Sequence, residues 1–462
     1  MLSTNVVNNL PPGSPSKSLL ETYPAEQYHD TINYLFGLQR FGIKLGLETM
    51  RLMLRAFGNP HHNFRSVHIA GSNGKGSVAA FVTTILRTAG YRTGLYTSPH
   101  LSDFSERIRI SGKSIAWDDV VQLTRRIRSK QHEVAADNGL AERSSCVTAM
   151  TFFEFTTLMA FLHFVQKQVD LAVVEAGMGG RLDATNVLTP VVSAITTITG
   201  EHRQFLGKTL AEIAREKAAI LKPDGVVITG ATQPQVLAAI RSRAKETRNT
   251  MYCLGKDIRV ARTGEAIFDY RGIFSFYHQL RISMMGEYQV TNAALAVGII
   301  EILRTCGYDI PGEAVREGLR NTKWPGRMEI VNHQPLVLLD GAHNLDAVKQ
   351  LAKELKTSLR YRRLCVVIGI MKDKPIRAML RRIVPLADHV ILTRPRLERA
   401  ASLSALFKVA REFASTMEIV DDVKEAVRKA LSWANQDDLV CVTGSLFTVG
   451  EARELFYDRV DV

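Results

Sequence analysis

The sequence lacks an apolar run long enough to cross a membrane, which takes about 18 residues. The best candidate, residues 148–165, is interrupted by Glu154 and His163, so we interpret it as a buried helix. The first 17 residues also lack the basic start and apolar core of a secretory signal. Their Pro, Ser and Asn content predicts a flexible tail over residues 1–17. We therefore expect a cytoplasmic protein with no membrane partner.

Cysteine is scarce and scattered along the chain. The five cysteines (Cys146, Cys253, Cys306, Cys365 and Cys441) include no closely spaced pair. This spacing argues against a zinc site and against a disulfide framework, and it fits a reducing compartment.

Acidic residues are outnumbered by basic ones. The 59 Lys and Arg against 46 Asp and Glu give a formal net charge of +13. Such a balance suits nucleic acid, but it also suits small polyanionic substrates. Because no long Lys/Arg run is interleaved with aromatic residues, we expect no nucleic-acid partner.

The order of apolar segments predicts two α/β domains. A chain of 462 residues exceeds one ordinary core, and short apolar runs alternating with helical periodicity are typical of parallel sheets covered by helices. Residues 250–285 break this alternation and predict an antiparallel insertion. A Pro-Gly breaker places the boundary near Trp324, with domains over 18–324 and 325–462. We expect strands in SVHIAG, TGLYTS, DLAVVEAG, VVSAITT and GVVITG, and then in LVLLDGAH, LCVVIGIM, HVILTRP, MEIV and LVCVTGS.

The segment HIAGSNGKGSVAAF, residues 68–81, has the composition of a phosphate-binding loop between a strand and a helix. Its spacing is shorter than the usual one, in which four residues separate the first Gly from Gly-Lys. Free N–H groups at the start of the helix would bind phosphate oxygens. The alternative is a glycine-rich turn without a ligand. The residues predicted to bind the phosphates are Gly71, Ser72, Asn73, Gly74, Lys75, Gly76 and Ser77.

Glu175 ends the apolar strand in LAVVEAGMGGRLDATN. Ligands of parallel sheets bind at the carboxyl ends of the strands, and a carboxylate near a polyphosphate is a natural magnesium ligand. The alternative is a solvated acidic residue at a strand end.

Lys217 falls on the apolar face of the helix predicted in TLAEIAREKAAIL, since it follows Ile213 by four residues and Ala214 by three. A buried lysine must be paired, lose its charge or be chemically altered. Alternatively its stem packs on the protein and its ammonium reaches water. On the pattern alone we favour this second interpretation.

Other polar residues are weaker candidates taken one at a time. His202 in GEHRQFLG is either a metal or phosphate ligand or a polar loop residue. Asp340 and His343 end a strand in LLDGAHN, Arg327 lies in WPGR between the domains, and Ser445 follows a strand in VTGSLF.

Together these segments resemble the folylpolyglutamate synthase family, including its bifunctional dihydrofolate synthase members, within the Mur ligase-like amide-bond ligases. The resemblance covers nearly the whole chain. It implies an N-terminal P-loop-type ATPase domain with a parallel sheet and a smaller, Rossmann-like C-terminal domain. The short phosphate loop is this family's form of the motif. The segments that carry it are HIAGSNGKGS, YTSPHLSDFSERIRISG, VEAGMGGRLDATN, TLAEIAREKAAILKP, WPGRMEIV, LLDGAHN and VTGSLFTVGEAR.

The resemblance implies an ATP-dependent reaction in which a folate or pteroate carboxylate becomes an acyl phosphate and is attacked by the amine of L-glutamate. It implies two magnesium ions and allows for a monovalent cation. We expect a monomer whose partners are small-molecule substrates: ATP, L-glutamate, and dihydropteroate or a reduced folate.

The resemblance also implies metal ligands. Ser98 and Glu175 match ligands of a first magnesium; His202 and Lys217 match ligands of a second, with Glu175 bridging. In the family this lysine is commonly carbamylated, so we reverse the preference stated above and expect a carbamate at Lys217.

Further roles follow by position. Asn292 matches a nucleotide contact, Arg327 a phosphate contact, and Asp340 and His343 nucleotide-side or catalytic residues. The expected catalytic set is Lys75, Lys217, Asp340 and His343, and the expected folate-side loop contains Ser105, Glu106 and Arg107.

Three positions depart from the family pattern. Glu201 stands where Asp is usual before His202, Tyr288 where His is common, and Ser105 where Asn is common. Rival interpretations are a ligase of peptidoglycan precursors, which would lack the TSPHL…ERIRI segment, a nucleotide-dependent switch without ligase activity, and a nucleic-acid binder.

Overall fold

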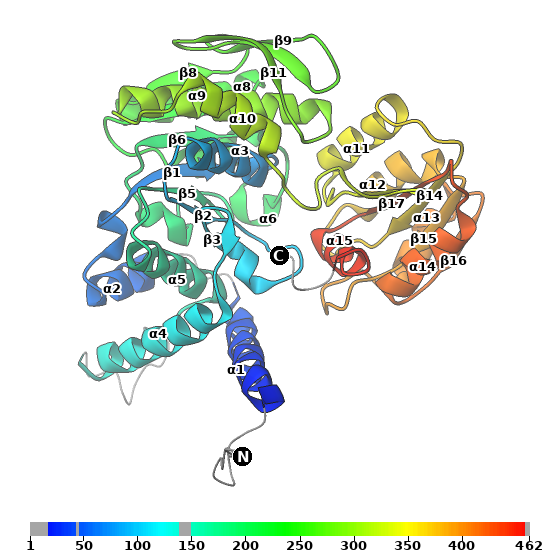
Figure 1. The fold of residues 1–462 in the computed structure, drawn as a ribbon, viewed down its shortest axis with the longest axis horizontal. Coiled ribbons are helices and arrows are strands. Elements are labelled where there is room, and N and C mark those ends of the chain that lie inside the picture. Colours follow the sequence, from blue (N-terminus) through cyan, green and yellow to red (C-terminus); the bar gives the residue numbers. More distant parts are fainter. Residues whose placement is uncertain (1–16, 43–45, 138–148, 458–462) are drawn as a thin grey trace, which may run out of the picture.

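The computed structural model describes residues 17–42, 46–137 and 149–457. The tail expected over residues 1–17 lies outside them, apart from Lys17, which begins helix α1 (Lys17–Gly37). Figure 1 shows two lobes side by side, a larger one containing the first two thirds of the chain and a smaller one containing the rest. In the described part of the chain, no helix has the length and apolarity needed to cross a membrane.

The larger lobe is built on an eight-stranded sheet. Its strands are β1 (Arg65–Ala70), β2 (Thr93–Tyr96), β3 (Ile108–Ile110), β4 (Lys113–Ser114), β5 (Leu171–Glu175), β6 (Val192–Ile195), β7 (Val226–Thr229) and β8 (Thr250–Cys253). Their order is β4-β3-β2-β5-β1-β6-β7-β8. All pairs from β2 to β8 in this order are parallel, and β3 and β4 join antiparallel at one edge. The five strands expected in the first half are confirmed.

Helices cover both faces of this sheet, which explains the apolar character of its strands. In β5, Val173 packs on one face while Ala172 and Val174 pack on the other. The first face carries α3 (Lys75–Thr88), α9 (Glu287–Thr305) and α10 (Gly312–Asn321). The second carries α1, α2 (Glu48–Ala56), α4 (Trp117–Asp137), α5 (Phe152–Gln166), α7 (Leu210–Ala218) and α8 (Pro234–Glu246), and α6 (Arg203–Leu206) precedes α7.

The antiparallel insertion expected at residues 250–285 is present but shorter. A three-stranded sheet contains β9 (Arg259–Arg262), β10 (Ile267–Arg271) and β11 (Phe276–Arg281) in the order β11-β10-β9. The expectation was wrong for residues 250–253, because β8 pairs parallel with β7 as the last strand of the main sheet.

The smaller lobe contains a six-stranded sheet. Its strands are β12 (Glu329–His333), β13 (Leu336–Leu339), β14 (Leu364–Ile368), β15 (His389–Leu392), β16 (Met417–Ile419) and β17 (Leu439–Thr443). The order is β12-β13-β17-β14-β15-β16, and only the β12–β13 pair is antiparallel. The five strands expected here are confirmed. The covering helices are α11 (Leu345–Thr357), α12 (Ile376–Ile383), α13 (Leu403–Ala410), α14 (Val423–Trp433) and α15 (Leu446–Arg453).

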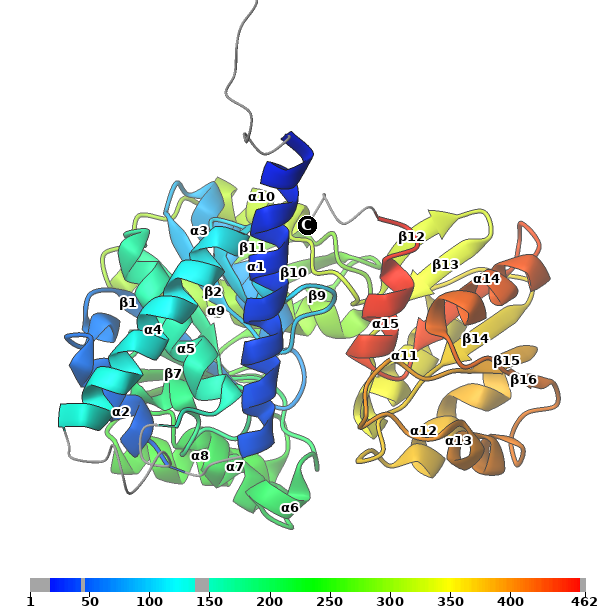
Figure 2. The same cartoon turned by 90° about the horizontal axis from the view of Figure 1, so that it is seen from below.

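The two lobes touch where α15 meets the loop after β2. Leu101 belongs to the larger lobe, yet it packs into a core cluster formed by the smaller one. The contact is close, since a Cβ atom at Gly450 would lie 2.0 Å from the Leu101 carbonyl oxygen. Figure 2 shows α15 on the side of the smaller lobe that faces the larger one.

Candidate active site

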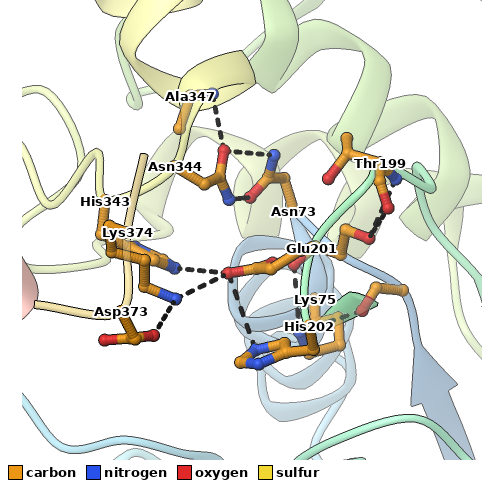
Figure 3. Close-up of polar contacts among 12 residues, drawn as sticks. Asn73, Lys75, Thr199, Glu201, His202, His343, Asn344, Ala347, Asp373 and Lys374 are labelled. Atoms are coloured by element: carbon orange, nitrogen blue, oxygen red, sulfur yellow. Dashed lines mark hydrogen bonds and ion pairs between the residues drawn. The ribbon is translucent and has the colours of Figure 1, made fainter. Parts of the chain in front are cut away.

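A cavity of about 1400 Å³ lies between the two lobes. It opens at the carboxyl ends of strands of both sheets, which is where parallel sheets bind ligands. Its lining includes Asn73, Gly74 and Ser77 with residues 197–204 from the larger lobe, and residues 340–347 and 373–375 from the smaller one. Figure 3 shows the polar side chains that meet there.

The phosphate-binding loop connects β1 directly to α3. Gly74, at φ 89°, has the left-handed backbone conformation that favours glycine, and the helix begins at the next residue. A Cβ atom at Gly74 would lie 2.4 Å from Asn292 Oδ1. Thr196 Oγ1 donates to the Asn73 carbonyl at 2.7 Å, so the neighbouring strand fixes the loop. The predicted loop therefore stands at the N-terminus of a 14-residue helix.

Lys75 points back over this loop. Its Nζ donates to the carbonyl oxygens of Gly71 at 3.2 Å and Ser72 at 3.1 Å, and it lies 3.6 Å from Glu175 Oε1. Glu175 is buried, so the solvated alternative is wrong. Burial raises the pKa of Glu175, while Lys75 and Arg327 oppose the increase. A cation at this carboxylate would relieve the cost of its burial.

Lys217 is buried at 5% exposure and donates from Nζ to the Gly71 carbonyl at 2.7 Å. The alternative in which its ammonium reaches water is therefore wrong. A capping box of Thr209 and Glu212 starts α7 and fixes the face on which Lys217 lies. Burial, followed by the charge of Lys75, lowers the pKa of Lys217 to about 7. A neutral, nucleophilic amine is thus populated at neutral pH.

The four expected metal ligands differ in how closely the structure gathers them. The Ser98 backbone N–H donates to Glu175, and Lys217 is within electrostatic reach of both Glu175 and His202. Across the ranges that the structure describes, no three His, Cys, Asp or Glu side chains form a ready-made metal cluster. The carboxylate of Glu175 and the hydroxyl of Ser98 are oxygen donors of the kind that magnesium prefers, and a carbamate at Lys217 would add another.

The Glu201 carboxylate lies close to three basic side chains, and these contacts could not be inferred from the sequence. Its Oε1 lies 3.7 Å from His202 Nε2, 3.4 Å from His343 Nε2 and 3.4 Å from Lys374 Nζ (Figure 3). Burial alone would raise the pKa of Glu201, but these three neighbours lower it overall. Lys374, which follows β14 in MKDKP, was missed. The only local signal was its place just after a strand of a parallel sheet.

A second contact joins the lobes through two amides. Asn344 Nδ2 donates to Asn73 Oδ1 at 2.8 Å, and Asn73 Nδ2 donates back to Asn344 Oδ1 at 3.3 Å. Asn344 Oδ1 also accepts from the Ala347 N–H at 2.9 Å, as the N-cap of α11. The phosphate-binding loop and the start of α11 are therefore held face to face.

Arg327, Asp340 and His343 of the smaller lobe line the same cavity. Ser445 is not among the lining residues; it is the N-cap of α15. Asp340 accepts from the backbone N–H groups of Met328 and Ala342, both at 3.0 Å. Burial raises its pKa, and Arg327 opposes this increase. His343 Nδ1 contacts the Gly341 carbonyl at 2.9 Å. Since a carbonyl only accepts, Nδ1 carries hydrogen, and Nε2 faces the Glu201 carboxylate at 3.4 Å.

Tyr288 and Asn292 lie at the start of α9. The Tyr288 hydroxyl bonds to Asp340, so the departure at this position replaces an imidazole by a phenol beside a buried carboxylate. Asn292 Nδ2 donates to Gln289 Oε1 at 2.9 Å, and its Oδ1 faces the phosphate-binding loop.

The expected folate-side loop is a short 3-10 turn, η3 (Phe104–Arg107), whose three predicted side chains are buried. Glu106 accepts from the N–H groups of Leu101, Ser102 and Asp103 at 2.8–3.0 Å. Arg107 donates to His100 Nδ1 at 2.8 Å and stacks over Phe152. In this structure Glu106 and Arg107 hold the loop in shape.

Two family models match the chain. The Mur ligase middle domain matches residues 69–300, and the Mur ligase glutamate ligase domain matches residues 326–446. The fold and the site thus define a Mur ligase.

Individual relatives narrow this class. A "Dihydrofolate synthase/folylpolyglutamate synthase" of Bacillus subtilis is 34% identical over 434 residues, which is 92% of this chain and 98% of that protein. A "Probable bifunctional folylpolyglutamate synthase/dihydropteroate synthase" of Halobacterium salinarum is 39% identical, over 92% of this chain and 51% of that protein. The chain thus spans about half the length of this second relative. The chain belongs to the dihydrofolate synthase/folylpolyglutamate synthase family.

Solved structures of similar proteins support the same family. The Mycobacterium tuberculosis folylpolyglutamate synthase complexed with ADP and AMPPCP is 31% identical, with a TM-score of 0.86 over 94% of this chain and 99% of that chain. The Yersinia pestis bifunctional folylpolyglutamate synthase/dihydrofolate synthase complexed with AMPPNP and a manganese ion is 29% identical, with a TM-score of 0.79 over 93% and 97%.

Proposed function

We propose that this chain ligates L-glutamate to the carboxylate of a pteroate or folate in an ATP-dependent reaction. The observation that carries the proposal is the cavity between the lobes, which has the phosphate-binding loop on one wall and Asp340 and His343 on the other. Relatives in complex with ADP, AMPPCP and AMPPNP support a nucleotide in this cavity.

The first step transfers the γ-phosphoryl group of ATP to the substrate carboxylate, giving an acyl phosphate and ADP. Phosphoryl transfer depends on positioning and on neutralisation of charge more than on covalent help. The backbone N–H groups at the start of α3 and the Lys75 ammonium would bind the phosphates. Arg327, at the junction of the lobes, would add a second positive charge from the opposite wall.

In the second step the amine of L-glutamate attacks the acyl carbon, and phosphate leaves. The amine must lose a proton. His343 would accept it at Nε2, because the Gly341 carbonyl fixes hydrogen on Nδ1. The imidazolium formed would be stabilised by the Glu201 carboxylate, 3.4 Å from Nε2. The net change converts tetrahydrofolate, ATP and L-glutamate into a folate longer by one glutamate, ADP and phosphate.

Magnesium, when bound, would offset the negative charge that gathers between carboxylate and phosphates. Ser98 and Glu175 would hold a first ion, and His202 and Lys217, together with Glu175, a second. For this role we propose that Lys217 reacts as its neutral amine with CO2, forming an N–C bond and releasing one proton. The product is a carbamate, which replaces a buried cation by oxygen ligands. Carbon-13 NMR under labelled CO2 should show a carbamate signal in the wild-type protein and none in Lys217→Met.

The test of the reaction is one assay with two substrates. The purified chain receives ATP, magnesium and L-glutamate, with dihydropteroate or tetrahydrofolate in separate reactions. We expect ADP release that depends on glutamate, with a matching product mass, and loss of both in Lys75→Ala. ADP release that ignores glutamate and folate would favour a nucleotide-dependent switch and contradict the proposal.

We propose both activities, because relatives at 30–34% identity over nearly their whole length carry both names. Turnover of tetrahydrofolate alone, under matched conditions, would reject the dihydrofolate synthase activity and leave glutamate addition to folates standing.

A further inference from the structure

A second cavity, of about 300 Å³, lies away from the cleft between the lobes. Helix α2 forms one wall, and Figures 1 and 2 both place α2 on the side of the larger lobe far from the smaller one. Its lining carries basic and amide groups and no carboxylate. The lining residues are Arg51, Leu54, Arg55, Asn59, His61, Asn186, Val187 and Lys222.

Two of these cations come from one helix. Arg51 and Arg55 are four residues apart in α2, whose other face is buried through Met50 and Met53. Like charges at this spacing destabilise a helix. Within the described part of the chain, neither guanidinium forms a hydrogen bond or an ion pair. Both forks of N–H donors are thus available beside the cavity.

The third cation comes from the segment after α7. Lys222 Nζ donates to the Asn186 carbonyl at 2.7 Å and to Asn186 Oδ1 at 2.9 Å. An ammonium has three donors, so one remains. Burial, and then the charges of Arg51 and Arg243, lower the pKa of Lys222 to about 8. The amine is thus half-buried beside other cations.

We propose that this cavity binds a small polyanion, one that carries two or more phosphate or carboxylate groups, at a site separate from the nucleotide cleft. Guanidinium forks match the oxygens of both groups in pairs. The volume lies at the small end of the range for small-molecule sites, which suits a compact anion. Polyphosphate and a short γ-linked glutamate chain share this chemistry.

Isothermal titration with pyrophosphate and with γ-linked triglutamate tests the site and separates the two sources. The variant Arg51→Gln/Arg55→Gln should bind the preferred anion at least tenfold more weakly than wild type. The control Arg381→Gln/Arg382→Gln removes the same charge from exposed positions of α12 and should bind as wild type does. The cleft is unchanged in all three proteins, so a difference between them reports on the second cavity.

Stronger binding of pyrophosphate assigns phosphate ligands, and stronger binding of triglutamate assigns carboxylates. Equal affinity of wild type and Arg51→Gln/Arg55→Gln for both anions would overturn the proposal. A second measurement needs no variant: the anion should slow reductive methylation of Lys222 at least threefold, read by mass spectrometry, without slowing that of exposed Lys208. Unchanged methylation of Lys222 would also count against the site.

Discussion

Replacing Lys217 by Met should make the protein more stable and inactive at the same time. The apolar chain of Met is close in length to that of Lys and fits a site at 5% exposure. Burial moves the pKa of Lys217 from its ordinary 10.5 to about 7, which corresponds to a cost of about 5 kcal/mol for the charged form. Lys217→Met does not have this cost, because Met carries no charge.

The variant also loses one hydrogen bond, to the Gly71 carbonyl, worth about 1 kcal/mol. The carbonyl stays satisfied, because Lys75 also donates to it. We therefore expect a net gain of about 3 to 4 kcal/mol in the free energy of unfolding at pH 7. Loss of the proposed metal ligand should reduce turnover on the order of 10²-fold or more.

The stability difference between Lys217→Met and the wild type should depend on pH. Because the folded pKa of Lys217 lies below the unfolded one, the unfolded chain binds more protons between about pH 7 and 10.5. The cost to the wild type is complete below pH 7 and vanishes as pH rises through this window. The advantage of the variant should therefore shrink from pH 7 to pH 9.

Urea denaturation in CO2-free buffer with EDTA measures the effect, since a carbamate or a metal would relieve the cost in the wild type. Equal stability of the two proteins at pH 7, with parallel pH profiles, would refute the buried cation. Wild-type turnover by Lys217→Met would refute the catalytic role.

Three further substitutions and the removal of metal ions provide additional tests. Gly74→Ala should lower the free energy of unfolding by at least 1 to 2 kcal/mol and weaken nucleotide binding, because the added Cβ would meet Asn292 Oδ1. The control is Gly90→Ala, at a similar φ of 94° with nothing within 4 Å, which measures backbone strain without the clash. Asn344→Ala should cost about 1 kcal/mol for the helix cap, measured by thermal denaturation, and more if the amide pair across the cleft is stabilising. Glu201→Gln should destabilise the chain by about 1 to 2 kcal/mol above pH 5; since the folded pKa of Glu201 is lowered, the difference from wild type should fade as the pH drops below its ordinary range. Chelation by EDTA should abolish ligation, and added magnesium or manganese should restore it; activity that survives chelation would contradict the metal sites.

The strands and the glycine loop could be predicted because their signals are local. Short apolar runs predicted ten strands correctly, each three to six residues long, and Gly71 to Ser77 form the loop in consecutive positions. The placement of β8 could not be predicted, because a short strand of mixed polarity does not show whether it will pair with β7 or with β9. For Lys217, the helical pattern gave the right face of α7 but could not give the depth of burial.

Contacts between the lobes could not be predicted from the sequence for another reason. Glu201 meets His343 and Lys374 from positions more than 140 residues away, and Asn73 meets Asn344 across 271 residues. No periodicity in one segment carries information about the partner in another. Each of these residues lies near the end of a strand, which predicts the edge of the sheet but not the atom that it will touch.

The close contact between Gly450 of α15 and Leu101 of the larger lobe couples the movements of the two lobes. The Leu101 carbonyl lies where a side chain of α15 would otherwise stand, and the N–H of the same residue donates to Glu106 of the η3 turn, which we expect to face the folate. That loop cannot shift toward the smaller lobe without pushing α15, and α15 cannot swing away without exposing Leu101 to water. A ligand that selects one position of the loop must then select a position of the smaller lobe as well. By reciprocity, whatever fixes the smaller lobe changes the affinity of the loop for its ligand by the same factor.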